Sequence, residues 1–137
     1  MPPAFWSHPP GPLLRLIRSL LPGRRTRRAR PEDAPVPVVS VGSLSRGGTG
    51  KTPAVIALAG RLAMRGRAVH VVTAGAGVPF QVDARGHDAN SIGDEPLLIA
   101  AFAPTWVAAD PVEGISAAAS AGAEVVVLDA GLIDPPV

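Results

Sequence analysis

The sequence predicts an α/β protein built on a parallel sheet with flanking helices, preceded by a short amphipathic N-terminal helix. From residue 36 onward, short β-branched runs alternate with segments of helical periodicity, and parallel strands require such crossover connections. A glycine-rich turn lies between the first strand and the first helix of this series, where parallel sheets bind their ligands. The 137 residues are enough for one such domain.

The first 30 residues form a basic head. Seven arginines precede the first acidic residue, Glu32, whereas the chain from residue 31 onward has six basic and eleven acidic side chains. In the stretch PGPLLRLIRSLLPG, leucine and isoleucine recur with helical spacing between Pro12 and Pro22, which predicts a short amphipathic helix. At about 1.5 Å per residue, this helix covers roughly half of a hydrocarbon core, so it cannot span a bilayer.

The basic head has two main interpretations. It can lie on a membrane surface, with Phe5 and Trp6 as interfacial anchors and the arginines facing anionic head groups. Alternatively, its leucine stripe packs on the rest of the chain and the arginines are solvated. Nucleic acid is disfavoured because no aromatic residues interleave with the arginines to stack on bases. We therefore expect residues 1–30 to contact a membrane surface and no nucleic acid.

A linker at residues 31–35 separates the head from a domain of residues 36–137. Strands are expected at residues 36–42, 67–73, 105–109 and 123–130, and helices at residues 52–65, 95–103 and 111–122. The strand runs are rich in valine, and the first helix repeats apolar residues at helical spacing from Val55 to Leu62. Periodicity predicts these strands but not which of them are neighbours in the sheet.

The stretch SRGGTGKT is typical of a loop that binds nucleotide phosphates. Its glycines allow backbone N–H groups to point at phosphate oxygens, and the next helix offers its N-terminus to the same anion. Lys51, the single lysine of the chain, would reach the β- and γ-phosphates, and the Thr52 hydroxyl would bind Mg²⁺. The standard G-x-x-x-x-G-K-[ST] pattern has glycine where this chain has Ser45. The predicted cofactor-binding residues of this P-loop NTPase-like fold are Ser45, Arg46, Gly47, Gly48, Thr49, Gly50, Lys51 and Thr52.

A second acidic group is expected to complete the magnesium site. The run EVVVLD places Asp129 at the end of an apolar strand, the usual position of a Walker B carboxylate. The alternative is an aspartate that caps a turn or a helix. Zinc and thiol chemistry are not expected, because the chain has no cysteine and its three histidines lack ligand spacing.

Four stretches together resemble the tetraacyldisaccharide 4′-kinase family of lipid A synthesis: PAFW, PVPVVSVGSLSRGGTGKTPAVIALAGRLAMRG, IGDEPLLIA and VVVLDAGL. They follow the family order over nearly the whole chain, and SVGSL and GDEPLL make the resemblance specific. It implies a P-loop fold that uses ATP and Mg²⁺. It also implies transfer of the γ-phosphate to the 4′-hydroxyl of tetraacyldisaccharide 1-phosphate, giving lipid IVA, by a peripheral protein at the cytoplasmic face of the bacterial inner membrane.

The same resemblance assigns roles to the acidic pair of the GDEP stretch. Asp94 would be the base that orients or deprotonates the sugar hydroxyl, and Lys51 would be the other catalytic residue. Glu95 would join Thr52 and Asp129 at the metal. Without the resemblance, Asp94 and Glu95 would be read as first-turn acids that the helix dipole favours.

Several positions around the predicted site depart from the family pattern. Two arginines, a tyrosine, a second Walker B aspartate and a histidine of that pattern are replaced in this chain by Ala74, Pro111, Ala76, Ala130 and Asp134. A cationic group can contribute about 10³ to 10⁵ in rate to phosphoryl transfer. A catalytically silent or fragmentary nucleotide-binding module of the same family is therefore an alternative. A membrane-associated ATPase with a deviant Walker loop is another, which the GDEP stretch disfavours.

Overall fold

The computed structural model describes residues 34–42 and 50–129 of the chain. The predicted head at residues 1–30 and the linker as far as residue 33 lie outside the described residues. Residues 43–49, which include the expected phosphate-binding positions 45–49, and residues 130–137 also lie outside them. The described part contains the predicted site residues from Gly50 onward.

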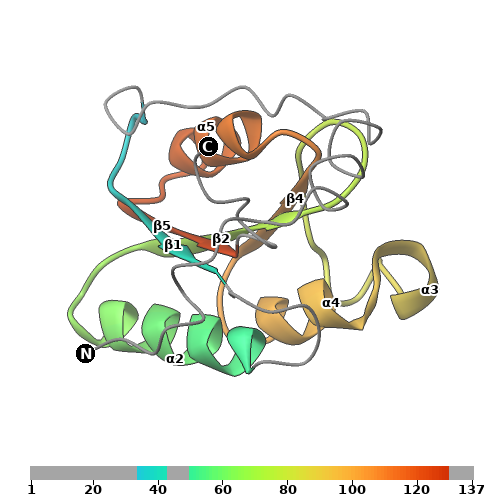
Figure 1. Cartoon of the computed structure of the whole chain (residues 1–137), viewed down its shortest axis with the longest axis horizontal. Helices are drawn as coiled ribbons and strands as arrows, with labels where there is room; N and C mark the ends of the chain where they lie inside the picture. The colour runs from blue at the N-terminus through green and yellow to red at the C-terminus, as the bar shows by residue number, and fades with distance from the viewer. Residues whose placement is uncertain (1–33, 43–49, 130–137) are drawn as a thin grey trace, which may run out of the picture.

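The described strands form one mostly parallel sheet. They are β1 (Val38–Val41), β2 (Val69–Ala74), β3 (Phe80–Gln81), β4 (Thr105–Ala108) and β5 (Val125–Asp129). Their order across the sheet is β1-β5-β2-β4-β3 (Figure 1), and only β3 pairs in the antiparallel direction. The expected α/β architecture with a parallel sheet is confirmed. The order adds that the last strand lies between the first two.

Helices cover both faces of this sheet. Those in the described residues are α2 (Lys51–Met64), α3 (Ala89–Ile92), α4 (Asp94–Ala100) and α5 (Pro111–Ser120). α2 and α4 lie on one face and α5 on the other (Figure 1). α5 begins with Pro111, and the carboxylate of the preceding Asp110 accepts a hydrogen bond from the Val112 N–H at 2.8 Å. This arrangement is the usual start of a helix.

Two short elements were not predicted from the sequence. β3 has only two residues, and it forms because the chain returns beside β4, where the Val82 N–H donates to the Thr105 carbonyl at 2.8 Å. α3 has four residues, and a capping box joins Asp88 and Ser91 at its start. Neither segment is long enough to have a measurable hydrophobic period.

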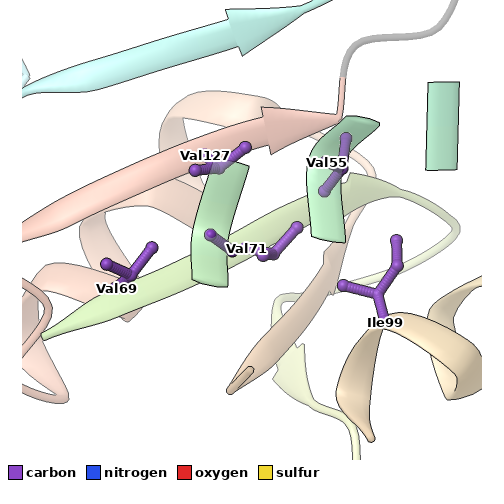
Figure 2. Close-up of a cluster of buried hydrophobic side chains, with 6 residues drawn as sticks. Val55, Val69, Val71, Ile99 and Val127 are labelled. Carbon is purple, nitrogen blue, oxygen red and sulfur yellow. The ribbon is translucent and has the colours of Figure 1, made fainter. Parts of the chain in front are cut away.

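A hydrophobic cluster lies on each face of the sheet. On the face covered by α2 and α4, Val55 and Ile99 pack with Val71 of β2 (Figure 2). On the opposite face, Val72 of β2 packs with Ile115 of α5. Val71 and Val72 are both almost fully buried, as expected for a central parallel strand. Alternate residues of β2 therefore face α2, and this series leads to Thr73 at the carboxyl end of the strand.

Candidate functional site

The candidate site lies where the carboxyl ends of three parallel strands meet. In the register of the sheet, Asp129 of β5 lies between Val41 of β1 and Thr73 of β2. α2 begins above this edge at Lys51, directly after Gly50. Gly50 has a φ of 74°, a left-handed conformation that glycine adopts with little strain. The chain can therefore turn sharply at Gly50, where the helix begins.

Lys51 and Asp129 form an ion pair at this edge. The Nζ atom lies 3.0 Å from Oδ1, and the exposed fractions of the two side chains are 21% and 1%. Oδ1 accepts no hydrogen bond from the residues that the structure describes, so the ammonium is its main compensating group. A carboxylate this deeply buried requires such a charge partner. The structure thus brings together the lysine of the predicted phosphate loop and the predicted Walker B carboxylate.

The other oxygen of this carboxylate has a partner that sequence reasoning missed. The Thr73 hydroxyl donates a hydrogen bond to Asp129 Oδ2 at 3.3 Å, and Thr73 is 6% exposed. In the sequence Thr73 is simply the last residue of a predicted strand. The sequence shows a threonine at the end of a valine-rich run, but its contact with Asp129 depends on strand order, which periodicity does not predict.

Thr52 and Glu95 make a second polar contact near the start of α2. The Thr52 hydroxyl donates a hydrogen bond to Glu95 Oε1. Glu95 lies in the first turn of α4, so this contact joins the predicted loop to the GDEP stretch. Two of the three predicted metal ligands are therefore in direct contact, and the third, Asp129, is bound to the neighbouring Lys51.

Asp94, the predicted base, is the first residue of α4 and is exposed. Gly93 precedes it with a φ of 88°, and an acidic residue in a first helical turn is favoured by the helix dipole. The structure therefore places Asp94 beside Glu95, at the helix end that reaches Thr52. The role of this carboxylate as a base stays a prediction.

The oxygen atoms at this edge suit a magnesium ion shared with phosphates. Mg²⁺ binds oxygen, and in nucleotide sites it takes one or two protein carboxylates together with phosphate oxygens and water. Thr52, Glu95 and Asp129 supply a hydroxyl and two carboxylates here. Within residues 34–42 and 50–129, no group of three or more His, Cys, Asp or Glu side chains forms a metal cage. The hydroxyl and the two carboxylates are oxygen donors of the kind that magnesium uses when phosphate oxygens supply its other ligands.

The fold and this edge define an α/β protein with a cluster of polar side chains at the carboxyl ends of parallel strands. The tetraacyldisaccharide-1-P 4′-kinase family model matches residues 12–136. The chain belongs to this family, as the resemblance predicted.

Curated relatives agree with the family match. The chain is 48% identical to a tetraacyldisaccharide 4′-kinase of Dinoroseobacter shibae, with 98% of this chain and 44% of the relative aligned. It is 46% identical to the protein of the same name from Rhodospirillum centenum, with 97% of this chain and 44% of the relative aligned. The chain thus spans less than half the length of these relatives. No solved structure matches it.

Proposed function

We propose that this chain acts as an ATP-dependent tetraacyldisaccharide 4′-kinase. It would transfer the γ-phosphate of ATP to the 4′-hydroxyl of tetraacyldisaccharide 1-phosphate and give lipid IVA. The observation that carries the proposal is the meeting of Lys51 and Asp129 at the carboxyl edge of the sheet, beside Thr52 and Glu95. A cation and oxygen ligands at the N-terminus of a helix after a parallel strand are the parts that phosphoryl transfer from ATP requires.

Each residue of the proposed P-loop NTPase site has a role. The backbone of residues 45–50 and the N-terminus of α2 would bind the phosphates, and Lys51 would move from Asp129 to the β- and γ-phosphates. Thr52, Glu95 and Asp129 would hold Mg²⁺. When bound, Mg²⁺ neutralises charge on the phosphoryl group being transferred. Asp94 would accept the proton of the 4′-hydroxyl as that oxygen attacks the γ-phosphorus, the bond from this phosphorus to the β,γ-bridging oxygen would break, and ADP would leave with that oxygen.

Nucleotide binding is tested by replacing the lysine. The wild-type chain is expected to bind Mg-ATP, and Lys51→Ala should abolish binding because the only cation described at this edge is lost. Arg61→Ala is a matched control, since Arg61 is an exposed basic residue in the last turn of the same helix. Calorimetric titration measures all three proteins. Equal binding by the wild type and Lys51→Ala would contradict the proposed site.

Turnover is tested with the lipid substrate. Tetraacyldisaccharide 1-phosphate and ATP labelled at the γ-phosphate are incubated with the chain, and label is expected in the lipid. A second candidate function is a silent nucleotide-binding module, which is favoured by the exposed Ala74 at the end of β2 where the family pattern has arginine. ATP binding without label in the lipid would support this module instead of the kinase.

The proposed site of action is the cytoplasmic face of the inner membrane, reached peripherally. None of the helices in the described ranges is long and apolar enough to cross a bilayer. Contact with the lipid surface would come from residues 1–30, whose arginines would each contribute about 1 kcal/mol near anionic head groups.

A further inference from the structure

We propose that Thr73 is a positioning residue that fixes the Asp129 carboxylate so that one oxygen faces Lys51 and the bound magnesium nucleotide. The nucleotide part of this inference rests on the proposed function, whereas the effect on Lys51 does not. Neither the phosphate-loop motif nor the GDEP stretch includes Thr73.

The sheet places Thr73 beside Asp129 by its register. Val71 and Val127 lie two residues before Thr73 and Asp129 on their strands, and both belong to the cluster covered by α2 (Figure 2). Side chains alternate between the two faces of a strand, so Thr73 and Asp129 point to this same face. On each strand, the polar residue follows the buried valine on this face, at the end of the strand near the start of α2.

The two sides of Asp129 are chemically different. Val41 of β1 lies opposite it on one side and has no polar side-chain atom, whereas Thr73 lies opposite it on the other and donates to Oδ2. The terminal torsion of an aspartate has a broad energy minimum, so burial alone does not determine which oxygen faces Lys51. A hydrogen bond to Oδ2 removes this freedom and leaves Oδ1 at 3.0 Å from the Lys51 ammonium.

The side chain of threonine suits this task. A hydroxyl has one proton to donate, and branching at Cβ restricts the χ1 angle that directs it. Partners that hold a metal-binding side chain in place typically contribute about 10- to 100-fold to metal affinity. The loss of the Thr73 hydroxyl should therefore weaken magnesium-dependent binding without removing any ligand.

The first test reads the position of Lys51 directly. Because Lys51 is the single lysine of the chain, lysine labelled with ¹³C at Cε alone gives one side-chain carbon signal, next to the ammonium, in an NMR spectrum. Thr73→Val, which keeps the shape and removes the hydroxyl, should displace this signal in the absence of metal and nucleotide. Thr73→Ser, which keeps the hydroxyl, should return the signal toward its wild-type position.

The second test measures the magnesium requirement. MgCl₂ is titrated into the chain in the presence of a fluorescent ATP analogue, and binding in EDTA is measured separately. Thr73→Val should raise the half-saturating Mg²⁺ concentration by about 10- to 100-fold, with a smaller change in EDTA. Thr73→Ser should stay close to the wild type.

Thr105→Val is the matched control. Thr105 is fully buried on the adjacent β4, and its hydroxyl donates to the Ala103 carbonyl at 2.9 Å, away from Asp129. This variant should lose stability but keep the wild-type Lys51 signal and magnesium requirement. An equal effect of Thr105→Val on both measurements would overturn the proposal, because general loss of packing would then explain them.

The remaining outcomes are also decisive. A wild-type Lys51 signal and magnesium requirement in Thr73→Val would overturn the proposal, as would failure of Thr73→Ser to restore them. If Thr73→Val does not fold, Thr73→Ala takes its place. Unfolding of both, with Thr105→Val folded, would mean that the hydroxyl serves the fold alone. If the wild type binds no Mg-ATP, the proposed function fails, and the Lys51 signal still decides the role of Thr73.

Discussion

At the scale of single residues, His70 and Trp106 form a polar contact on the face of the sheet opposite the candidate site. The Trp106 indole N–H donates to His70 Nδ1 at 3.2 Å, and the two rings lie nearly parallel, 17° apart. His70 is buried, and this burial lowers its pKa below the ordinary value of 6.5. The neutral imidazole is therefore the form that the fold favours, because Nδ1 must be unprotonated to accept the hydrogen bond.

This pKa shift predicts loss of stability in mild acid. The unfolded chain takes up a proton at His70 at a higher pH than the folded chain does. The contribution of neutral His70 to the free energy of unfolding is therefore complete above about pH 6.5. This contribution decreases as the pH drops below that value. His70→Asn should reduce this fall, because its amide oxygen can accept from Trp106 but does not titrate. Urea unfolding at several pH values between about 7.5 and 5.5 measures the effect.

The comparison between the two proteins isolates the contribution of His70. His8 and His87 are present in both proteins, so the difference between the two proteins reports on position 70. The depressed pKa of Asp88, caused first by its hydrogen bond with Ser91, acts at more acidic pH, below about 3.8. Parallel loss of stability in the wild type and His70→Asn would show that His70 is not responsible.

The sequence identified several residues that meet at the candidate site, but not how they are arranged. Lys51, Thr52 and Asp129 follow from the motif and from the position of an acid after an apolar strand, since both patterns are local. The hydrogen bond from Thr73 to Asp129 could not be predicted, because it depends on β5 lying next to β2. That neighbour relation is a long-range property of packing, and hydrophobic periodicity does not encode it.

At the scale of elements, α5 lies close to the sheet because one of its residues is Gly114. A Cβ atom there would lie 2.7 Å from Val72 Cγ1 and 3.0 Å from Ala108 Cβ. Alanine normally stabilises a helix interior by about 0.5–1 kcal/mol relative to glycine. In a packed core, however, an extra carbon costs about 1–3 kcal/mol. We expect Gly114→Ala to lower the free energy of unfolding, measured by urea denaturation.

Gly60 in the middle of α2 is the matched control for this prediction. Apart from its chain neighbours and the nearby backbone of α2 itself, no atom of the described residues lies within 4 Å of a Cβ built on Gly60, and the residue is exposed. Gly60→Ala should therefore stabilise the protein by about 0.5–1 kcal/mol through helix propensity alone. If the two substitutions change stability in the same direction, close packing of α5 is not the reason for Gly114.

The long elements were predictable because their patterns span several turns or a full strand. α2 was expected from apolar spacing between Val55 and Leu62, and β5 from its run of valines. α4 is shorter than expected, since it ends at Ala100 while the prediction continued to residue 103. There the chain turns, and the Phe102 and Ala103 N–H groups both bond to the Ile99 carbonyl. Local tertiary contacts of this kind decide helix ends, which propensity alone does not determine.

At the scale of the whole molecule, charge is divided between two regions. The described residues carry five basic and eight acidic side chains, whereas residues 1–30 carry seven arginines and no acid. The described part therefore offers little attraction to an anionic surface. If the protein meets a lipid substrate at a membrane, the head is the region whose charge favours that contact.

Liposome flotation tests the role of the head and separates its two interpretations. The full chain is expected to float with vesicles that contain anionic lipid, and less so as salt screens the attraction. Replacing the five arginines after the leucine stripe with glutamine should greatly reduce flotation, because each contributes about 1 kcal/mol near the surface. Those residues are Arg24, Arg25, Arg27, Arg28 and Arg30.

If the leucine stripe instead packs on the domain, deletion of residues 1–30 would lower the free energy of unfolding and leave flotation unchanged. Equal flotation of all three proteins would therefore rule out the head as a membrane anchor.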